Sequence, residues 1–153
     1  MYFSQGWEHA SHRSGRTRLA TGNAPVVLLI GGARPRATYR SILSQGGYDI
    51  IDAAEAGEGL SFARRLLPNL ILVELAMPIQ DGWEINRMLK SDPATYLIPV
   101  VAASLTTQPA GTYHRARSAG FVDYIARPIE RRHVLELVAA WTRPPAQATS
   151  QAY

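Results

Sequence analysis

The 153-residue sequence has no cysteine, a single lysine and no long uncharged apolar run. Without cysteine the chain forms no disulfide framework, no thiolate metal site and no cysteine nucleophile. Because no run of about eighteen apolar residues occurs, we expect no transmembrane segment. The first 18 residues also lack the apolar core of a secretory signal. Together these absences favour a cytoplasmic protein.

Positive charge is in excess, but its distribution does not indicate a nucleic-acid site. Arg13, Arg16 and Arg18 lie in the first 24 residues, where Glu8 is the only acid, so this segment accounts for half of the net charge of +4. All but one of the 16 basic residues are arginine, which is typical of a general coding bias. We therefore expect no nucleic-acid partner.

Length and patterning predict one folded domain with an extension at each end. Residues 1–24 have no apolar period and are rich in Ser, Gly, Arg and His, which predicts a flexible extension. Residues 25–143 are enough for one compact domain. Pro144 and Pro145 stop the last helix, and residues 144–153 are predicted to form a short tail.

Five apolar segments alternate with five amphipathic segments in the predicted domain. Strands are predicted at residues 26–30, 48–54, 69–75, 98–104 and 121–126. Helices are predicted at residues 35–46, 59–67, 81–92, 109–119 and 130–142. Strict alternation gives βαβ units with right-handed crossovers, and therefore an α/β, doubly wound, three-layer sandwich around a parallel sheet. Its binding crevice should lie beyond the C-terminal ends of the strands.

Local signals support several of these helices. Pro35 suits the first turn of its helix, and Tyr39 and Leu43 share the apolar face that follows. Asp81 can cap the helix that it precedes. Gly111 is predicted inside the fourth helix, which it should weaken by about 1 kcal/mol relative to alanine.

Three motifs resemble the receiver domains of two-component response regulators, in the same order and spacing. LILVELAMPIQDGWE is similar to the third strand of the family and the loop after it. IPVVAASL is similar to the fourth strand, and AGFVDYIARPI to the fifth. The resemblance covers about residues 25–142. It implies a flavodoxin-like fold, with five parallel strands in the order 2-1-3-4-5 and five helices.

The resemblance also locates a site, and there the chain departs from the family. In the family an acidic pair after strand 1 and an Asp at the end of strand 3 hold Mg²⁺, and that Asp accepts a phosphoryl group. Here Gly31 and Gly32 replace the pair, and Glu74 replaces the acceptor. Because Mg²⁺ requires several oxygen ligands, usually including carboxylates, the departure implies no metal, no cofactor and no catalytic residue.

The switch positions that remain by resemblance are Ser104, Tyr124 and Arg127, the last in place of a lysine. Two interpretations of Glu74 stay open. In one, it imitates a phosphorylated Asp, although it has one charge and two oxygens where a phosphoryl group has nearly two charges and three oxygens. In the other, it belongs to a repaired site, in which a bidentate pair with Arg127 satisfies the carboxylate.

These departures predict a non-phosphorylatable pseudo-receiver that acts as a protein–protein interaction module in signalling or in a regulatory complex. By resemblance, the partner surface is the face of the fourth helix, fifth strand and fifth helix, which could also form a homodimer. Its candidate residues are Arg115, Arg117, Tyr124, Arg131 and Arg132. The alternatives are a small-ligand sensor that uses the vacated pocket beside the two glycines, and a phosphorylated response regulator.

Overall fold

Five strands and five helices alternate in the computed structural model, which describes residues 24–77, 79–104 and 109–143. The strands are β1 (Val26–Ile30), β2 (Asp49–Ala53), β3 (Leu70–Glu74), β4 (Val100–Ala103) and β5 (Asp123–Ile125). The helices are α3 (Ala33–Gln45), α4 (Ala56–Leu66), α5 (Gly82–Ser91), α6 (Thr112–Ser118) and α7 (Arg131–Thr142). The predicted alternation is confirmed, whereas both predicted terminal extensions lie outside the described residues, apart from residue 24.

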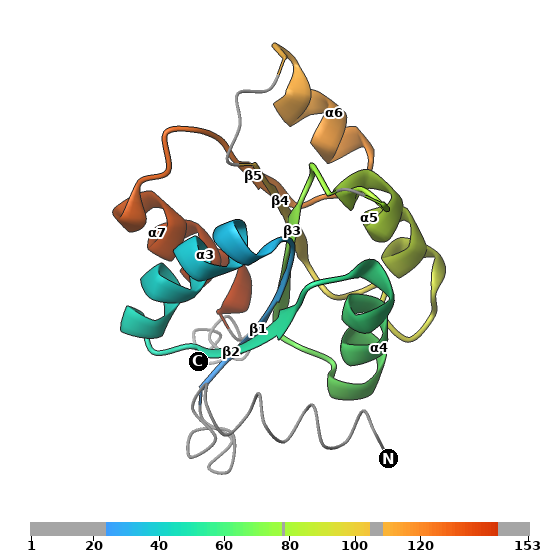
Figure 1. The fold of residues 1–153 in the computed structure, drawn as a ribbon, viewed down its shortest axis with the longest axis horizontal. Helices are drawn as coiled ribbons and strands as arrows, with labels where there is room; N and C mark the ends of the chain where they lie inside the picture. The colour runs from blue at the N-terminus through green and yellow to red at the C-terminus, as the bar shows by residue number, and fades with distance from the viewer. Residues whose placement is uncertain (1–23, 78, 105–108, 144–153) are drawn as a thin grey trace, which may run out of the picture.

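The sheet is parallel throughout, and its strand order is β2-β1-β3-β4-β5. This is the order that the family resemblance implied. Figure 1 shows α3 and α7 on one face of the sheet and α4, α5 and α6 on the other. None of the described helices is both long enough and apolar enough to cross a membrane.

The central strands are apolar on both faces because helices cover both. In β1, Leu28 and Ile30 belong to a core cluster shared with α4 and α5, whereas Val27 and Leu29 belong to a cluster shared with α3 and α7. The same alternation places Leu72 of β3 in the α3 and α7 cluster. A strand of this kind carries core residues on both sides, so a polar residue at its end is surrounded by packed side chains.

The predicted position of Gly111 was wrong. Gly111 precedes α6 as its N-cap, with a φ of +90°, and the helix begins at Thr112, three residues later than predicted. Glycine adopts this left-handed conformation without the steric cost that a Cβ would bring. Gly111 therefore ends a loop and does not weaken a helix interior.

The predicted start of α4 was also wrong, because the helix begins at Ala56 and not at Gly59. At the helix start the Glu58 carboxylate accepts a hydrogen bond from the Ala54 N–H at 3.1 Å. Gly59 lies inside the helix, where an added Cβ would lie 2.6 Å from the Ile30 Cδ1. Close packing of α4 on β1 therefore requires a glycine in a helix that glycine disfavours.

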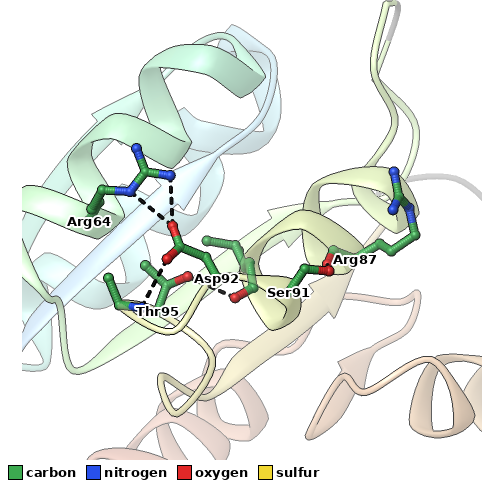
Figure 2. Close-up of polar contacts among 7 residues, drawn as sticks. Arg64, Arg87, Ser91, Asp92 and Thr95 are labelled. Atoms are coloured by element: carbon green, nitrogen blue, oxygen red, sulfur yellow. Dashed lines mark hydrogen bonds and ion pairs between the residues drawn. The ribbon is translucent and has the colours of Figure 1, made fainter.

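Polar contacts tie α4 to the C-terminal end of α5 (Figure 2). The Asp92 Oδ2 accepts from the Arg64 Nε at 2.9 Å and from its Nη2 at 2.7 Å. The Asp92 Oδ1 accepts from the Ala94 N–H at 2.9 Å, and the Thr95 hydroxyl donates to the Leu89 carbonyl at 2.7 Å. The pKa of Asp92 is lowered, mainly by the Ala94 N–H and then by Arg64.

These contacts predict how Asp92 contributes to stability as the pH changes. Because its pKa is lowered in the folded state, its ionised form stabilises the fold above the ordinary aspartate pKa. This contribution is lost as the pH falls through the lowered pKa. We expect Asp92→Asn to lower the melting temperature near neutral pH, and the difference from the parent to shrink on acidification.

Thermal unfolding followed by circular dichroism from about pH 7 to about pH 3 measures the effect of Asp92→Asn. Glu136→Gln is the matched control, because Glu136 forms an exposed i,i+4 pair with Arg132. We expect the control to melt like the parent throughout, since exposed pairs of this kind contribute little. A difference between parent and Asp92→Asn that does not change with pH would contradict the prediction.

Candidate functional site

The residues predicted to form the site lie at one edge of the sheet, beyond the C-terminal ends of its strands. Gly31 follows β1, Glu74 ends β3, Ser104 follows β4 and Arg127 lies two residues beyond β5. In the parallel register Glu74 is opposite Ala103, the last residue of β4. Segments far apart in the sequence therefore meet at the edge where doubly wound sheets carry their binding crevices.

The site residues differ in how far they are buried. Glu74 is 4% exposed, and its Oε2 accepts from the Ala76 N–H at 3.4 Å. Ser104 is fully buried, and its own N–H donates to the Ile125 carbonyl at 3.4 Å. Arg127 is exposed. The pairing of Glu74 with Arg127 stays a prediction.

Gly31 and Glu74 approach each other closely. A Cβ added to Gly31 would lie 3.0 Å from the Glu74 Cβ, which is closer than carbon atoms normally pack. At Gly32, the neighbouring N-cap of α3, an added Cβ would meet only the Pro35 Cδ, at 3.8 Å. A side chain at the first glycine would therefore need Glu74 to shift by a few tenths of an ångström, whereas one at the second would not.

The magnesium ion of the family's site does not fit the residues present. Gly31 and Gly32 offer no side-chain oxygen, which leaves Glu74 as the carboxylate of the three positions. Across the described ranges, no three or more His, Asp or Glu side chains gather where they could hold a metal ion. Any side chain added at Gly31 would need Glu74 to shift by a few tenths of an ångström. These three positions together therefore offer a metal ion a single carboxylate.

Two tyrosines lie near Glu74, on opposite faces of the sheet. Tyr39 of α3 is 1% exposed, and its pKa is raised mainly by burial and then by the charge of Glu74. Tyr124 of β5 is half-buried and packs against the opposite cluster, and its pKa is raised by the same two causes in the same order. The sequence predicted Tyr39 only as part of an apolar helix face. A polar hydroxyl on an otherwise apolar helix face was the sequence feature that could have marked Tyr39 as more than a packing residue.

Cavities of very different size lie around the site. A cavity of about 10 Å³ lies beside Glu74 and is lined also by Pro35, Arg36 and Tyr39. Another, of about 230 Å³, lies between α6 and β5 beside Tyr113, and one of about 410 Å³ lies between the β2–α4 and β3–α5 loops. Since one water molecule requires about 10–15 Å³, the first cavity has no room for a larger ligand.

The two arginines of α6 that were predicted to bind a partner lie in different surroundings. The Arg115 guanidinium lies 4.2 Å from the ring centroid of Trp83 in α5, a cation–π geometry. Trp83 in turn packs edge-to-face on Phe121, with 5.6 Å between the ring centroids. Arg117 donates to the Val122 carbonyl at 2.8 Å. Arg115 therefore contributes to packing between α5 and α6, and Arg117 lies beside the start of β5.

The face of α6, β5 and α7 also carries exposed aromatic residues that the sequence analysis missed. Tyr113 is 44% exposed, and Trp141 is 38% exposed while its Nε1 donates to the Asp123 Oδ2 at 3.3 Å. Arg131 and Arg132, the two predicted arginines of α7, are exposed in its first turn. The signal for Trp141 was its helical spacing from the apolar residues of α7, at the margin of the buried stripe.

Comparison with known proteins gives a family match over most of the chain. The model for the response regulator receiver domain matches residues 34–139. The chain is 30% identical over 103 residues to the polar-differentiation response regulator DivK of Brucella anthropi, covering 67% of this chain and 83% of DivK. It is 27% identical over 115 residues to the protein PilH of Pseudomonas aeruginosa, covering 74% of this chain and 94% of PilH.

A solved structure supports the same likeness. The crystal structure of a response regulator from Desulfuromonas acetoxidans superposes with a TM-score of 0.66 at 32% sequence identity. The superposition covers 75% of this chain and 94% of that protein.

The contact between Gly31 and Glu74 predicts unequal effects of substituting the two glycines. We expect Gly31→Ala to lower the melting temperature, because the new methyl group would overpack a buried site, at a cost of about 1–3 kcal/mol. Gly32→Ala is the matched control and should change stability by less than about 1 kcal/mol, because its new methyl group meets ordinary van der Waals contact. Chemical denaturation of both variants measures the difference. Equal stability of the two would contradict the prediction.

Proposed function

This chain belongs to the receiver-domain family of response regulators, and on that premise we propose that it is a pseudo-receiver. Receiver domains of this family are signalling domains that interact with other proteins, and they are generally not enzymes. We propose in addition that this member accepts no phosphoryl group and acts by binding a partner protein. The observation that carries the proposal is the close approach of Gly31 to Glu74 at the place where the family holds its metal ion.

Phosphoryl transfer depends on positioned charge more than on covalent chemistry of the protein. A metal ion and its carboxylate ligands supply most of that charge. Gly31 and Gly32 supply none of it, and the Glu74 carboxylate is almost completely buried. The glutamate therefore lacks both the metal that would neutralise an incoming phosphate and an open approach for the donor.

We infer that Glu74 serves as a fixed structural carboxylate and not as a full imitation of a phosphorylated aspartate. Its single charge lies within a crowded site, with Gly31 against its Cβ and the Ala76 N–H against its Oε2. A phosphoryl group would bring nearly two charges and three acceptor oxygens. The cavity beside Glu74, at about 10 Å³, lends no support to a small-ligand sensor at that position.

The partner surface proposed here is the face of α6, β5 and α7. β5 is an edge strand of the sheet, and Tyr113 and Trp141 offer exposed aromatic area beside it. Aromatic side chains are enriched among the residues that dominate binding energy at interfaces. Arg117, Arg131 and Arg132 add positive charge, which favours a partner with an acidic patch. The alternative is that a second copy of this chain binds the same face and forms a homodimer.

The proposed inability to accept phosphate predicts an unchanged mass. We expect the full chain to gain no stable phosphoryl group after incubation with Mg²⁺ and acetyl phosphate, because no metal site supports the transfer. Intact-mass spectrometry measures this directly. A receiver domain that keeps its acidic pair is the positive control, and Glu74→Gln is the matched negative control. A phosphoryl group that maps to Glu74 and disappears in the variant would overturn the proposal.

The proposed surface predicts which charges a partner requires. We expect the combined change of Arg117, Arg131 and Arg132 to glutamate to abolish partner capture, because charge reversal opposes an acidic patch. Arg115 stays unchanged in this variant, since its contact with Trp83 supports the packing of α5 and α6. Affinity capture from cells of the source organism, followed by mass spectrometry, measures the loss. Binding by the parent should weaken as salt increases.

The control for this experiment reverses the same number of exposed arginines elsewhere, namely Arg34, Arg65 and Arg87. We expect this control to retain the partner, which separates a local effect from a change in net charge. Sedimentation velocity of both variants distinguishes a homodimer from a different partner. Loss of capture in the control but not in the proposed-surface variant would move the interface to another face.

A further inference from the structure

The hydroxyl of Tyr39 is a buried polar group that the fold does not satisfy directly. Tyr39 is 1% exposed, and among the described residues its hydroxyl has no hydrogen-bond partner. Its ring packs in the cluster that contains Leu29 and Leu72, on the α3 and α7 face of the sheet. Buried hydroxyl groups in native proteins nearly always make a hydrogen bond. The hydroxyl therefore needs a partner that is not a neighbouring side chain.

A cavity of about 10 Å³ lies between the Tyr39 side chain and Glu74. Leu29, Ile30 and Leu72 line the cavity with apolar side chains, and Tyr39, Arg36 and Glu74 are the lining residues that carry polar groups. Glu74 also contributes to the raised pKa of Tyr39, as expected for a carboxylate close to the phenol. The volume corresponds to about one water molecule, and cavities of this size hold water when their lining is polar.

The lining of the cavity includes an α3 side chain that is itself held in place by a hydrogen bond. Arg36 lines the cavity, and its Nε donates to the Gly31 carbonyl at 2.8 Å. Gly31 lies close to Glu74, since a Cβ added to it would lie 3.0 Å from the Glu74 Cβ. A molecule in this space would thus lie among residues of α3, β1 and β3.

We propose that this cavity is a hydration site for a single ordered water molecule, which accepts from the Tyr39 hydroxyl and donates to the Glu74 carboxylate. Tyr39 is then a positioning residue for Glu74, since it acts on the carboxylate through the water. The site is independent of the partner surface, because it concerns how α3 holds the end of β3. It also goes beyond the loss of phosphorylation, which would stand without it.

The direction in which one substitution changes the melting temperature tests the water bridge. If the cavity holds the bridging water, Tyr39→Phe removes a hydrogen bond and should lower the melting temperature by several degrees. If the cavity is dry, the same change removes an unsatisfied buried hydroxyl and should raise it. Tyr48→Phe is the matched control, because Tyr48 is 8% exposed and belongs to the same core cluster. We expect the control to change the melting temperature less than Tyr39→Phe does.

Two further measurements separate bridging from simple packing. In a Glu74→Leu background, which lacks the acceptor, Tyr39→Phe should no longer lower the melting temperature as it does in the parent. A high-resolution crystal structure of the full chain should show one water within hydrogen-bond distance of both the Tyr39 Oη and a Glu74 carboxylate oxygen. This second measurement needs no variant, so it decides the matter even if Tyr39→Phe does not fold. An ordered site without that water, or a Tyr39→Phe variant that melts above the parent, would overturn the proposal.

Discussion

A carboxylate buried at the end of a central strand is the constraint on which the rest of this site depends. Glu74 closes β3, where helices cover both faces of the sheet and little solvent reaches. A charge in such a place is costly unless its surroundings compensate for it. Neighbouring residues accommodate the buried carboxylate in different ways. Gly31 leaves room for the side chain, the Ala76 N–H donates to it, and Tyr39 lines the same very small cavity as Glu74.

The same constraint shapes the proposed function. A receiver that switches gains and loses the charge of a phosphoryl group. In the family a metal ion offsets that negative charge during the transfer. Position 74 instead carries its carboxylate as part of the chain, and on this proposal Gly31 replaces one of the family's metal ligands. What the domain offers to other molecules on this proposal is therefore its surface. On the face of α6, β5 and α7, that surface combines exposed aromatic rings with arginines.

Sequence patterns predicted the architecture well because the architecture follows from local periodicity. Apolar runs without alternation indicated strands covered on both faces, and the amphipathic segments between them indicated crossover helices. The errors concern glycines. Gly59 lies within α4 because a larger residue would collide with Ile30, and Gly111 precedes α6 because its backbone is left-handed. The presence of glycine in a sequence does not identify which of three constraints requires it: close packing, a positive φ or the end of a helix.

By itself, the sequence determined the family and the parallel sheet, and it predicted the loss of the acidic pair. These properties depend on residue type and on spacing along the chain, and both can be counted in the sequence. Only the tertiary structure decided that Gly31 lies close to Glu74, that Arg115 lies over Trp83 and that Tyr39 and Glu74 line one cavity. Such contacts join segments distant in sequence. They depend on how closely two elements approach and on which rotamer each side chain adopts, and neither is encoded in a periodicity.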